Sequence, residues 1–238
     1  MSPTVPPAPP RTLLPLCATP DEDPQAWAEA VALGLSRAVA VITLPVPAID
    51  GSAPVQWARL AEAIDVLAAA GVEPIGHVSL GYATRPLVDL LADITRWAVL
   101  PVVGIFLDHA PAGPFQIGPV ALAARIARRA GLNTIVLNPG VPVDPIYRRL
   151  DVTVCTFEGP WSEYRDWSGE DGEPGDGHLV YAVPTAERSR ALALLSAHGA
   201  GLGLVTDRTG PYAGSGTGAT MRNGAVVDDR APTPASAR

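Results

Sequence analysis

The fold is decided by the stretch EPIGHVSLGYATRPLVDLLADITRWAVLPVVGIFLD, which runs over residues 73–108. It begins with an apolar run, Glu73–Ser79, which is typical of a buried strand. An amphipathic segment over 85–98 follows, and Pro86 marks its start, as proline does in the first turn of many helices. A second apolar run covers 102–107. The stretch therefore predicts a strand, a helix and a second strand, which is a βαβ unit.

The same alternation of apolar runs and amphipathic segments continues through most of the chain. We expect strands over 12–18, 38–44, 73–79, 102–107, 133–137, 151–157, 179–183 and 201–206, and helical segments over 24–35, 54–70, 85–98, 119–130, 144–149, 161–167 and 186–197. Eight strands at roughly 25–30 residues per unit predict an α/β fold, a compact (β/α)8 TIM-like barrel. A doubly wound open sheet is the alternative, because strand number alone does not establish closure.

Composition agrees with one well-packed domain. The chain has 238 residues, of which 47% are hydrophobic and 17% are charged, and its formal net charge is −7. Low charge with high apolar content is the opposite of a disordered composition, and this length fits a single domain. We therefore expect one barrel domain over 12–220, with a Pro-rich tail over 1–11 and a flexible C-terminal tail over 221–238.

The composition argues against nucleic acids and membranes as partners. All 17 basic residues are arginines, and they form no block that could neutralise a phosphate backbone. The longest apolar run, over 97–107, contains Pro101 and Gly104 and is well short of the ~20 residues that span a bilayer. We therefore expect neither nucleic-acid binding nor a membrane span, and the sequence does not specify an oligomeric state.

The N-terminal segment bears on location. The first residues, MSPTVPPAPPRTLLPLCATP, lack the charged start and apolar core of a secretory signal. The expected location is therefore cytoplasmic. In that compartment the two cysteines, Cys17 and Cys155, are expected to be buried free thiols.

Acidic residues follow several expected strands. Asp108 ends the fourth strand, Glu158 the sixth and Asp207 the eighth, and the active sites of such barrels lie at the C-terminal strand ends. Because side chains alternate along a strand, Asp108 should share a face with Phe106, and Glu158 with Thr156. Paired carboxyl groups across the barrel mouth are what glycoside hydrolysis requires. The alternative is that these acids cap helices or hold loops.

Five short motifs in series carry a resemblance. They are GHVSLGYATR at 76–85, GIFLD at 104–108, LNPG at 137–140, FEG at 157–159 and VTD at 205–207. In order and spacing the chain resembles the spherulin-4 family from Leu13 to Tyr212. The resemblance implies a (β/α)8 barrel and an activity like that of glycoside hydrolases of family 135. Those enzymes cleave a polysaccharide that contains α-linked galactosamine and N-acetylgalactosamine.

The resemblance places the catalytic carboxyl groups on Asp108 and Glu158. The family usually has Asp-Glu where this chain has Asp108-His109. The end of the first strand, Cys17-Ala18-Thr19, and the Leu44-Pro45 pair after the second also depart from the family pattern. A barrel that binds carbohydrate or serves a structural role without catalysis is therefore the alternative to a hydrolase.

Further residues at strand ends are candidates for substrate binding. Tyr82 could stack on a sugar ring, and Arg85 could hold a carboxylate or instead pair with Asp89 one helical turn on. Asn138 could bond a hydroxyl group or serve only the Asn-Pro-Gly turn. His77 is expected to be a hydrogen-bonded core histidine. The expected substrate-binding set is His109, Tyr82, Arg85, Asn138, Trp161 and Asp207.

The sequence also contains residues that could form a metal site or a phosphate site. His77, Asp108, His109 and Asp207 are ligand types at strand ends, but the chain has no His-x-His or HExxH pattern. A metal-assisted hydrolase is therefore the weaker hypothesis. The glycine-rich segment over 209–218 could cradle a phosphate, although a flexible loop fits better because no lysine is present. We expect a carbohydrate partner and no cofactor.

Overall fold

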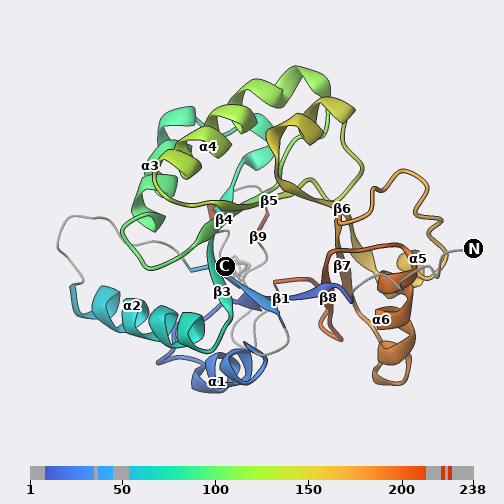
Figure 1. Cartoon of the computed structure of the whole chain (residues 1–238), viewed down its shortest axis with the longest axis horizontal. Coiled ribbons are helices and arrows are strands. Elements are labelled where there is room, and N and C mark those ends of the chain that lie inside the picture. Colours follow the sequence, from blue (N-terminus) through green and yellow to red (C-terminus); the bar gives the residue numbers. More distant parts are fainter. Residues whose placement is uncertain (1–8, 35–36, 45–53, 213–220, 223–224, 227–238) are drawn as a thin grey trace, which may run out of the picture.

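The computed structural model describes residues 9–34, 37–44, 54–212, 221–222 and 225–226. Eight strands, β1 to β8, close into a barrel in chain order, with the helices around its outside (Figure 1). All neighbouring strands of the barrel are parallel, and β1 pairs with β8 to complete the ring. The predicted (β/α)8 barrel is confirmed, and the open doubly wound sheet was the wrong alternative.

The elements follow each other at short intervals. The barrel strands are β1 Arg11–Leu16, β2 Ala38–Ile42, β3 Glu73–Ser79, β4 Gly104–Asp108, β5 Thr134–Asn138, β6 Thr153–Pro160, β7 Gly177–Tyr181 and β8 Leu202–Val205. The α-helices are α1 Pro24–Ala32, α2 Pro54–Ala69, α3 Leu87–Trp97, α4 Ile117–Arg129, α5 Trp161–Tyr164 and α6 Arg188–Ala197. Short 3-10 helices cover Gly81–Ala83, Pro114–Gln116, Pro145–Leu150 and Thr185–Glu187.

Local chemistry explains where several elements begin and end. Asp23 accepts a hydrogen bond from the backbone N–H of Ala26 at 3.1 Å and so caps α1. The segment expected as a helix over 144–149 is a 3-10 helix, and Asp144 accepts from the N–H of Ile146 at 3.0 Å at its start. The expected turn over 161–167 is α-helical only in α5.

Strand β6 departs from the strict alternation that the sequence predicts. Its pairing with β7 shifts between Cys155 and Phe157, which marks a β-bulge. Cys155 packs in the barrel interior, whereas Phe157 packs outside it. The extra residue returns Glu158 to the inner face, where it contacts Asn138. The expected shared face of Glu158 and Thr156 is therefore wrong, although Glu158 does face the barrel mouth.

The core has two layers separated by the strands. The interior of the barrel is filled by Leu13, Val39, Val41, Ile75, Phe106, Val136, Cys155, Leu179, Leu202 and Leu204. The larger layer lies between the strands and the helices and includes the buried ring of Trp97. A Cβ at Gly76 would lie 2.2 Å from Cδ2 of Trp97, so glycine is required on β3 for α3 to pack closely.

The ends of the chain lie largely outside the described residues. This holds for residues 1–8 and 227–238 of the expected tails, for 213–218 of the glycine-rich segment and for Pro45. The short strands β9 Met221–Arg222 and β10 Ala225–Val226 pair in antiparallel orientation. Cys17 and Cys155 are free thiols, half-buried and buried respectively.

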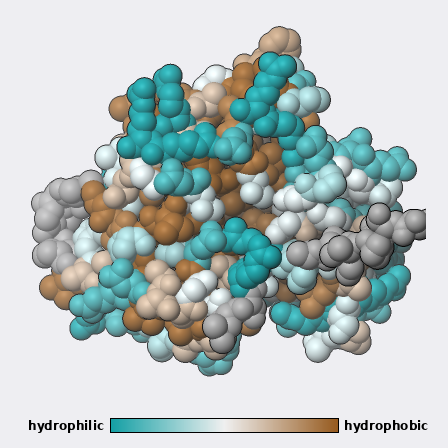
Figure 2. All heavy atoms as spheres, viewed as in Figure 1, coloured by the Kyte–Doolittle hydropathy of each residue, from teal (hydrophilic) through white to brown (hydrophobic). Residues whose placement is uncertain are grey.

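The described helices show no membrane-spanning segment. None of them is both long and apolar enough to cross a bilayer. Figure 2 shows hydrophobic side chains reaching the surface in patches between hydrophilic ones. Among the described large apolar side chains, Phe115 is the most exposed, at 96%.

Candidate active site

Three polar side chains meet on adjacent strands at the C-terminal end of the barrel. Asp108 ends β4, Asn138 ends β5 and Glu158 lies near the end of β6. The amide nitrogen Nδ2 of Asn138 donates to Oδ1 of Asp108 at 2.8 Å and to Oε2 of Glu158 at 2.5 Å. The parallel register pairs Asp108 with Asn138 directly. The structure therefore brings together the two carboxyl groups that the sequence singled out.

Asp108 is held as an anion. Its side chain is buried, Nε2 of His77 donates to Oδ2 at 3.0 Å, and the backbone N–H of His109 donates to Oδ1 at 2.8 Å. Burial alone would raise the pKa of Asp108, but the hydrogen bond and charge of His77, the charge of His109 and the Asn138 bond together lower it. The expected core histidine, His77, is thus hydrogen-bonded to the site itself.

The pKa of Glu158 is shifted in the opposite direction, upward. Burial raises the pKa of Glu158, the charge of Asp108 raises it further, and the bond from Asn138 only partly opposes this. The carbonyl of Gly140 accepts a hydrogen bond from the N–H of Glu158 at 3.1 Å. Gly140 has φ +70°, and a Cβ added to it would lie only 3.1 Å from Cβ of Glu158, so the two residues are closely packed. The Asn-Pro-Gly segment therefore forms a turn and also positions both carboxyl groups.

The rim around these groups has an unusual backbone. Tyr82 (φ 51°), Ala83 (φ 67°) and His109 (φ 49°) all adopt left-handed conformations, which cost energy in residues other than glycine and cluster at functional sites. Oγ of Ser79 shares a hydrogen bond with Nδ1 of His109 at 2.9 Å. The rings of Tyr82 and His109 lie 5.4 Å apart. The predicted residues Tyr82 and His109 thus lie together beside the carboxyl pair.

Two further tyrosines border the site and were not recognised from the sequence. Tyr181 ends β7, and burial followed by the charge of Glu158 raises its pKa. Tyr212 packs edge-on against the rings of His77 and Phe106, at 5.7 and 6.2 Å. The sequence shows only that Tyr212 follows the eighth strand. Because tyrosines are common in loops, this position alone does not identify it as a site residue.

Three of the predicted substrate-binding residues make no contact with Asp108 or Glu158 among the described residues. They are Arg85, Trp161 and Asp207. Arg85 donates to Asp93 at 2.5 Å and to the carbonyl of Ser79 at 2.9 Å. It therefore forms the local ion pair that was the alternative to substrate binding, with Asp93 and not with Asp89. Trp161 is buried against the outer side of β6 and β7. Asp207 is exposed.

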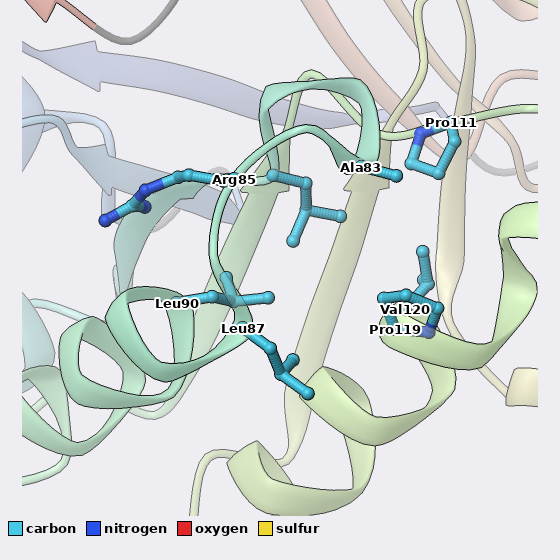
Figure 3. A pocket seen from close by; sticks show the side chains of 8 residues that line it. Ala83, Arg85, Leu87, Leu90, Pro111, Pro119 and Val120 are labelled. Atoms are coloured by element: carbon cyan, nitrogen blue, oxygen red, sulfur yellow. The ribbon is translucent and has the colours of Figure 1, made fainter.

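Arg85 also borders a small apolar pocket between α3 and α4. Its guanidinium group points away from the pocket, as Figure 3 shows. The other lining residues are Leu80, Ala83, Leu87, Leu90, Pro111, Pro119 and Val120. Their side chains are apolar, so this pocket offers no group for acid–base chemistry.

The acidic and histidine side chains at the barrel mouth do not form a metal-binding cluster among the described residues. In the part of the chain that the structure describes, no three His, Cys, Asp or Glu side chains are grouped so as to hold a metal ion. At the barrel mouth His77 and Asn138 both donate hydrogen bonds to Asp108.

The chain was compared with known proteins. A curated relative, spherulin-4 of Physarum polycephalum, is 32% identical over 103 residues, which cover 42% of this chain and 31% of the relative, so the match spans less than a third of that protein. The crystal structure of Aspergillus clavatus Sph3 in complex with GalNAc is similar with a TM-score of 0.73 and 21% identity, over 87% of this chain and 92% of that chain. It supports the barrel fold.

The family assignment rests on a longer match than either of these. The model of the spherulation-specific family 4 matches residues 11–221, from the first barrel strand to beyond the eighth. The chain therefore belongs to the spherulation-specific family 4.

Proposed function

We propose that this protein is a glycoside hydrolase that cleaves an amino-sugar-containing polysaccharide through Asp108 and Glu158. The observation that supports this best is the carboxyl pair itself. One nitrogen of Asn138 bridges the two groups, and the pKa of Asp108 is lowered whereas that of Glu158 is raised. Two neighbouring carboxyl groups in different protonation states are what general acid and nucleophilic roles require.

The two roles follow from the two environments. Glu158, whose pKa is raised, holds its proton to a higher pH than an ordinary glutamic acid and can donate it to the leaving oxygen as the glycosidic bond breaks. Asp108, with its lowered pKa, is ionised and can form a bond to the anomeric carbon. In the second step water attacks that carbon, Glu158 accepts the proton of the water, and the bond to Asp108 breaks.

The spacing of the pair favours retention of configuration. One oxygen of each carboxyl group accepts from the same nitrogen, at 2.8 and 2.5 Å, so the two oxygens cannot be further apart than the sum of these distances. That limit is below the ~6.5–9.5 Å of inverting enzymes and near the ~5–5.5 Å of retaining ones. We therefore propose that the product keeps the anomeric configuration of the substrate.

The substrate class is drawn from similarity. The resemblance to glycoside hydrolases of family 135 suggests a polysaccharide with α-linked galactosamine and N-acetylgalactosamine, and Sph3 was crystallised with GalNAc. The rings of Tyr82 and His109 on the rim add flat surfaces against which a sugar could pack.

A specific observation favours a second function, carbohydrate binding without hydrolysis. Asp108 is only 2% exposed, and His77, Asn138 and the backbone of His109 already donate to its oxygens. A carboxylate held in this way serves well as a structural anion and is poorly placed to attack a carbon. His109, which stands where the family usually has Glu, lies on the rim above it.

A hydrolysis screen separates the two functions. Polysaccharide rich in galactosamine and N-acetylgalactosamine is incubated with the natural chain, with Asp108→Asn and with Glu158→Gln, and released oligosaccharides are measured by mass spectrometry. Each substitution should lower the rate by about 10²–10⁴-fold, whereas Asp207→Asn, at an exposed position, serves as the control. Unchanged hydrolysis in both variants would remove the pair from the mechanism. Binding without hydrolysis by the natural chain would favour the second function.

A further inference from the structure

Two polar atoms beside the carboxyl pair are buried and make no hydrogen bond within the described residues. They are Oδ1 of Asn138 and the hydroxyl oxygen of Tyr212. Buried polar groups almost always have a partner, and leaving one without a partner costs free energy. Asn138 donates to both Asp108 and Glu158, and Tyr212 packs against His77, which donates to Asp108.

The orientation of the Asn138 amide is fixed by its neighbours. Both hydrogens of Nδ2 are directed at carboxyl oxygens, one of Asp108 and one of Glu158. The reversed amide would place Oδ1 against the anionic Asp108, which is unfavourable. Oδ1 therefore points away from the pair, and as an acceptor it needs a donor. The side chain as a whole is only 2% exposed.

Tyr212 brings the second atom from the opposite side of the barrel. It follows β8, and Sγ of Cys17 at the end of β1 donates to its carbonyl at 3.4 Å. Its ring packs on the interior cluster and on His77. His77 in turn donates to Asp108 at 3.0 Å, so the ring of Tyr212 lies one side chain away from the carboxyl pair. The hydroxyl is neutral and can donate one hydrogen bond.

We propose that Asn138 Oδ1 and the Tyr212 hydroxyl form a subsite for a hydroxyl group of the ligand. A hydroxyl group can donate to the amide oxygen and accept from the phenol at once, so it satisfies both unpartnered atoms. The subsite takes a neutral polyol such as a sugar, and it deepens the proposed function by assigning to Tyr212 a role in ligand binding. It rests on the ligand being a carbohydrate and does not require hydrolysis.

The test is the substitution Tyr212→Phe, which keeps the ring contacts and removes only the hydroxyl. Because that hydroxyl has no partner among the residues that the structure describes, its removal should leave the melting temperature unchanged or raise it. Binding should weaken by roughly 3–10-fold, as expected for one lost hydrogen bond. Affinities for galactose, galactosamine and N-acetylgalactosamine are measured by titration calorimetry, and melting temperatures by calorimetric scanning.

Tyr147→Phe is the matched control. Its buried hydroxyl does have a partner, since it donates to the carbonyl of Gly113 at 2.8 Å. This variant should therefore lose stability and keep its sugar affinity, which is the reverse of the Tyr212→Phe result.

Three outcomes would overturn the subsite. The first is equal sugar affinity in the natural chain and in Tyr212→Phe. The second is a fall in the melting temperature of Tyr212→Phe as large as that of Tyr147→Phe. The third is that the natural chain binds none of the three sugars. A natural chain that binds sugar more tightly than Tyr212→Phe and hydrolyses no polysaccharide supports the subsite and contradicts the hydrolase proposal alone.

Discussion

Two histidines of this barrel, His77 with 10% of its side chain exposed and His178 fully buried, have opposite surroundings. His77, on β3, donates to the carboxylate of Asp108 inside the mouth at 3.0 Å. His178, on β7, lies on the outer side of the barrel, where Nδ1 meets the hydroxyl of Tyr164 at 2.8 Å and the ring of Trp167 stands perpendicular to it at 5.0 Å. One histidine is paired with an anion and the other is enclosed by aromatic rings. The surroundings of His77 favour a charged partner, and those of His178 favour a neutral ring.

The pKa values express the same difference. The pKa of Asp108 is lowered because His77, His109 and Asn138 outweigh the effect of burial. Burial, followed by the charge of His198, lowers the pKa of His178 to about 4. Both groups therefore favour folding in their high-pH form, an anion in the mouth and a neutral ring behind β7.

Removal of the anion from the mouth should have the largest effect on stability. In Asp108→Ala, His77 and Asn138 lose the acceptor to which both donate. Breaking a buried charged pair of this kind costs about 3–5 kcal/mol of the free energy of unfolding. Urea denaturation at pH 7 measures the change.

An exposed acid provides the matched control for that experiment. Asp207→Ala, at a surface position after β8, should change the free energy of unfolding by less than about 0.5 kcal/mol. If Asp108→Ala were no more destabilising than Asp207→Ala, the idea that the mouth holds a stabilising anion would be refuted.

The pH dependence of stability should separate the two regions. The folded chain resists protonation of His178, whereas the unfolded chain takes up that proton near its ordinary value of 6.5. Stability should therefore fall as the pH falls from about 6.5 to about 4, by at most about 3 kcal/mol. The contribution of Asp108 is present above the ordinary value of 3.8 and should be lost only at lower pH.

Melting temperatures between pH 7 and pH 5 test this separation. In His178→Phe the difference in melting temperature between the two pH values should shrink, although the variant is less stable at pH 7 because Tyr164 loses its partner. In Asp108→Ala the difference should persist. If the difference in melting temperature persisted in His178→Phe and vanished in Asp108→Ala, the titrating group would lie in the mouth and not behind β7, which would contradict the prediction.

The contrast also shows what a sequence can predict in such a barrel. Apolar runs and helix signals in 73–108 repeat along the chain, and they were sufficient to predict the (β/α)8 barrel and β3 to the residue. Asp108 and Glu158 were recognisable because both end apolar strands. These features depend on local patterns with a period of two or of about 3.6 residues.

The remaining features depend on contacts between distant segments. The bulge at Cys155 and Phe157 arises from pairing with β7, and a strict alternation cannot reveal it. The partner of His77 is 31 positions away, and Tyr212 reaches the mouth from beyond β8. Arg85 pairs with Asp93 rather than Asp89, and the spacing of these two acids on α3 did not show which of them would be the partner. Residue types were visible in the sequence, and their partners were not.

The smallest expected effect on stability concerns Glu158 and has the opposite sign to that of Asp108. Burial and the charge of Asp108 raise the pKa of Glu158, so the ionised carboxyl group opposes folding as the pH rises above its ordinary value of 4.5. Glu158→Gln keeps an oxygen to accept from Asn138 and removes the charge.

At pH 7 this variant should gain up to about 1 kcal/mol in the free energy of unfolding, and the gain should disappear below pH 4.5. Urea denaturation at pH 7 and pH 4 measures both values, and a loss of stability at pH 7 would contradict the prediction. Asp108 and Glu158 share one hydrogen-bond donor, so opposite signs would mean that the mouth stabilises one negative charge and resists a second. A pair that holds a single charge is suited to donating a proton at one carboxyl group and carrying the anion at the other.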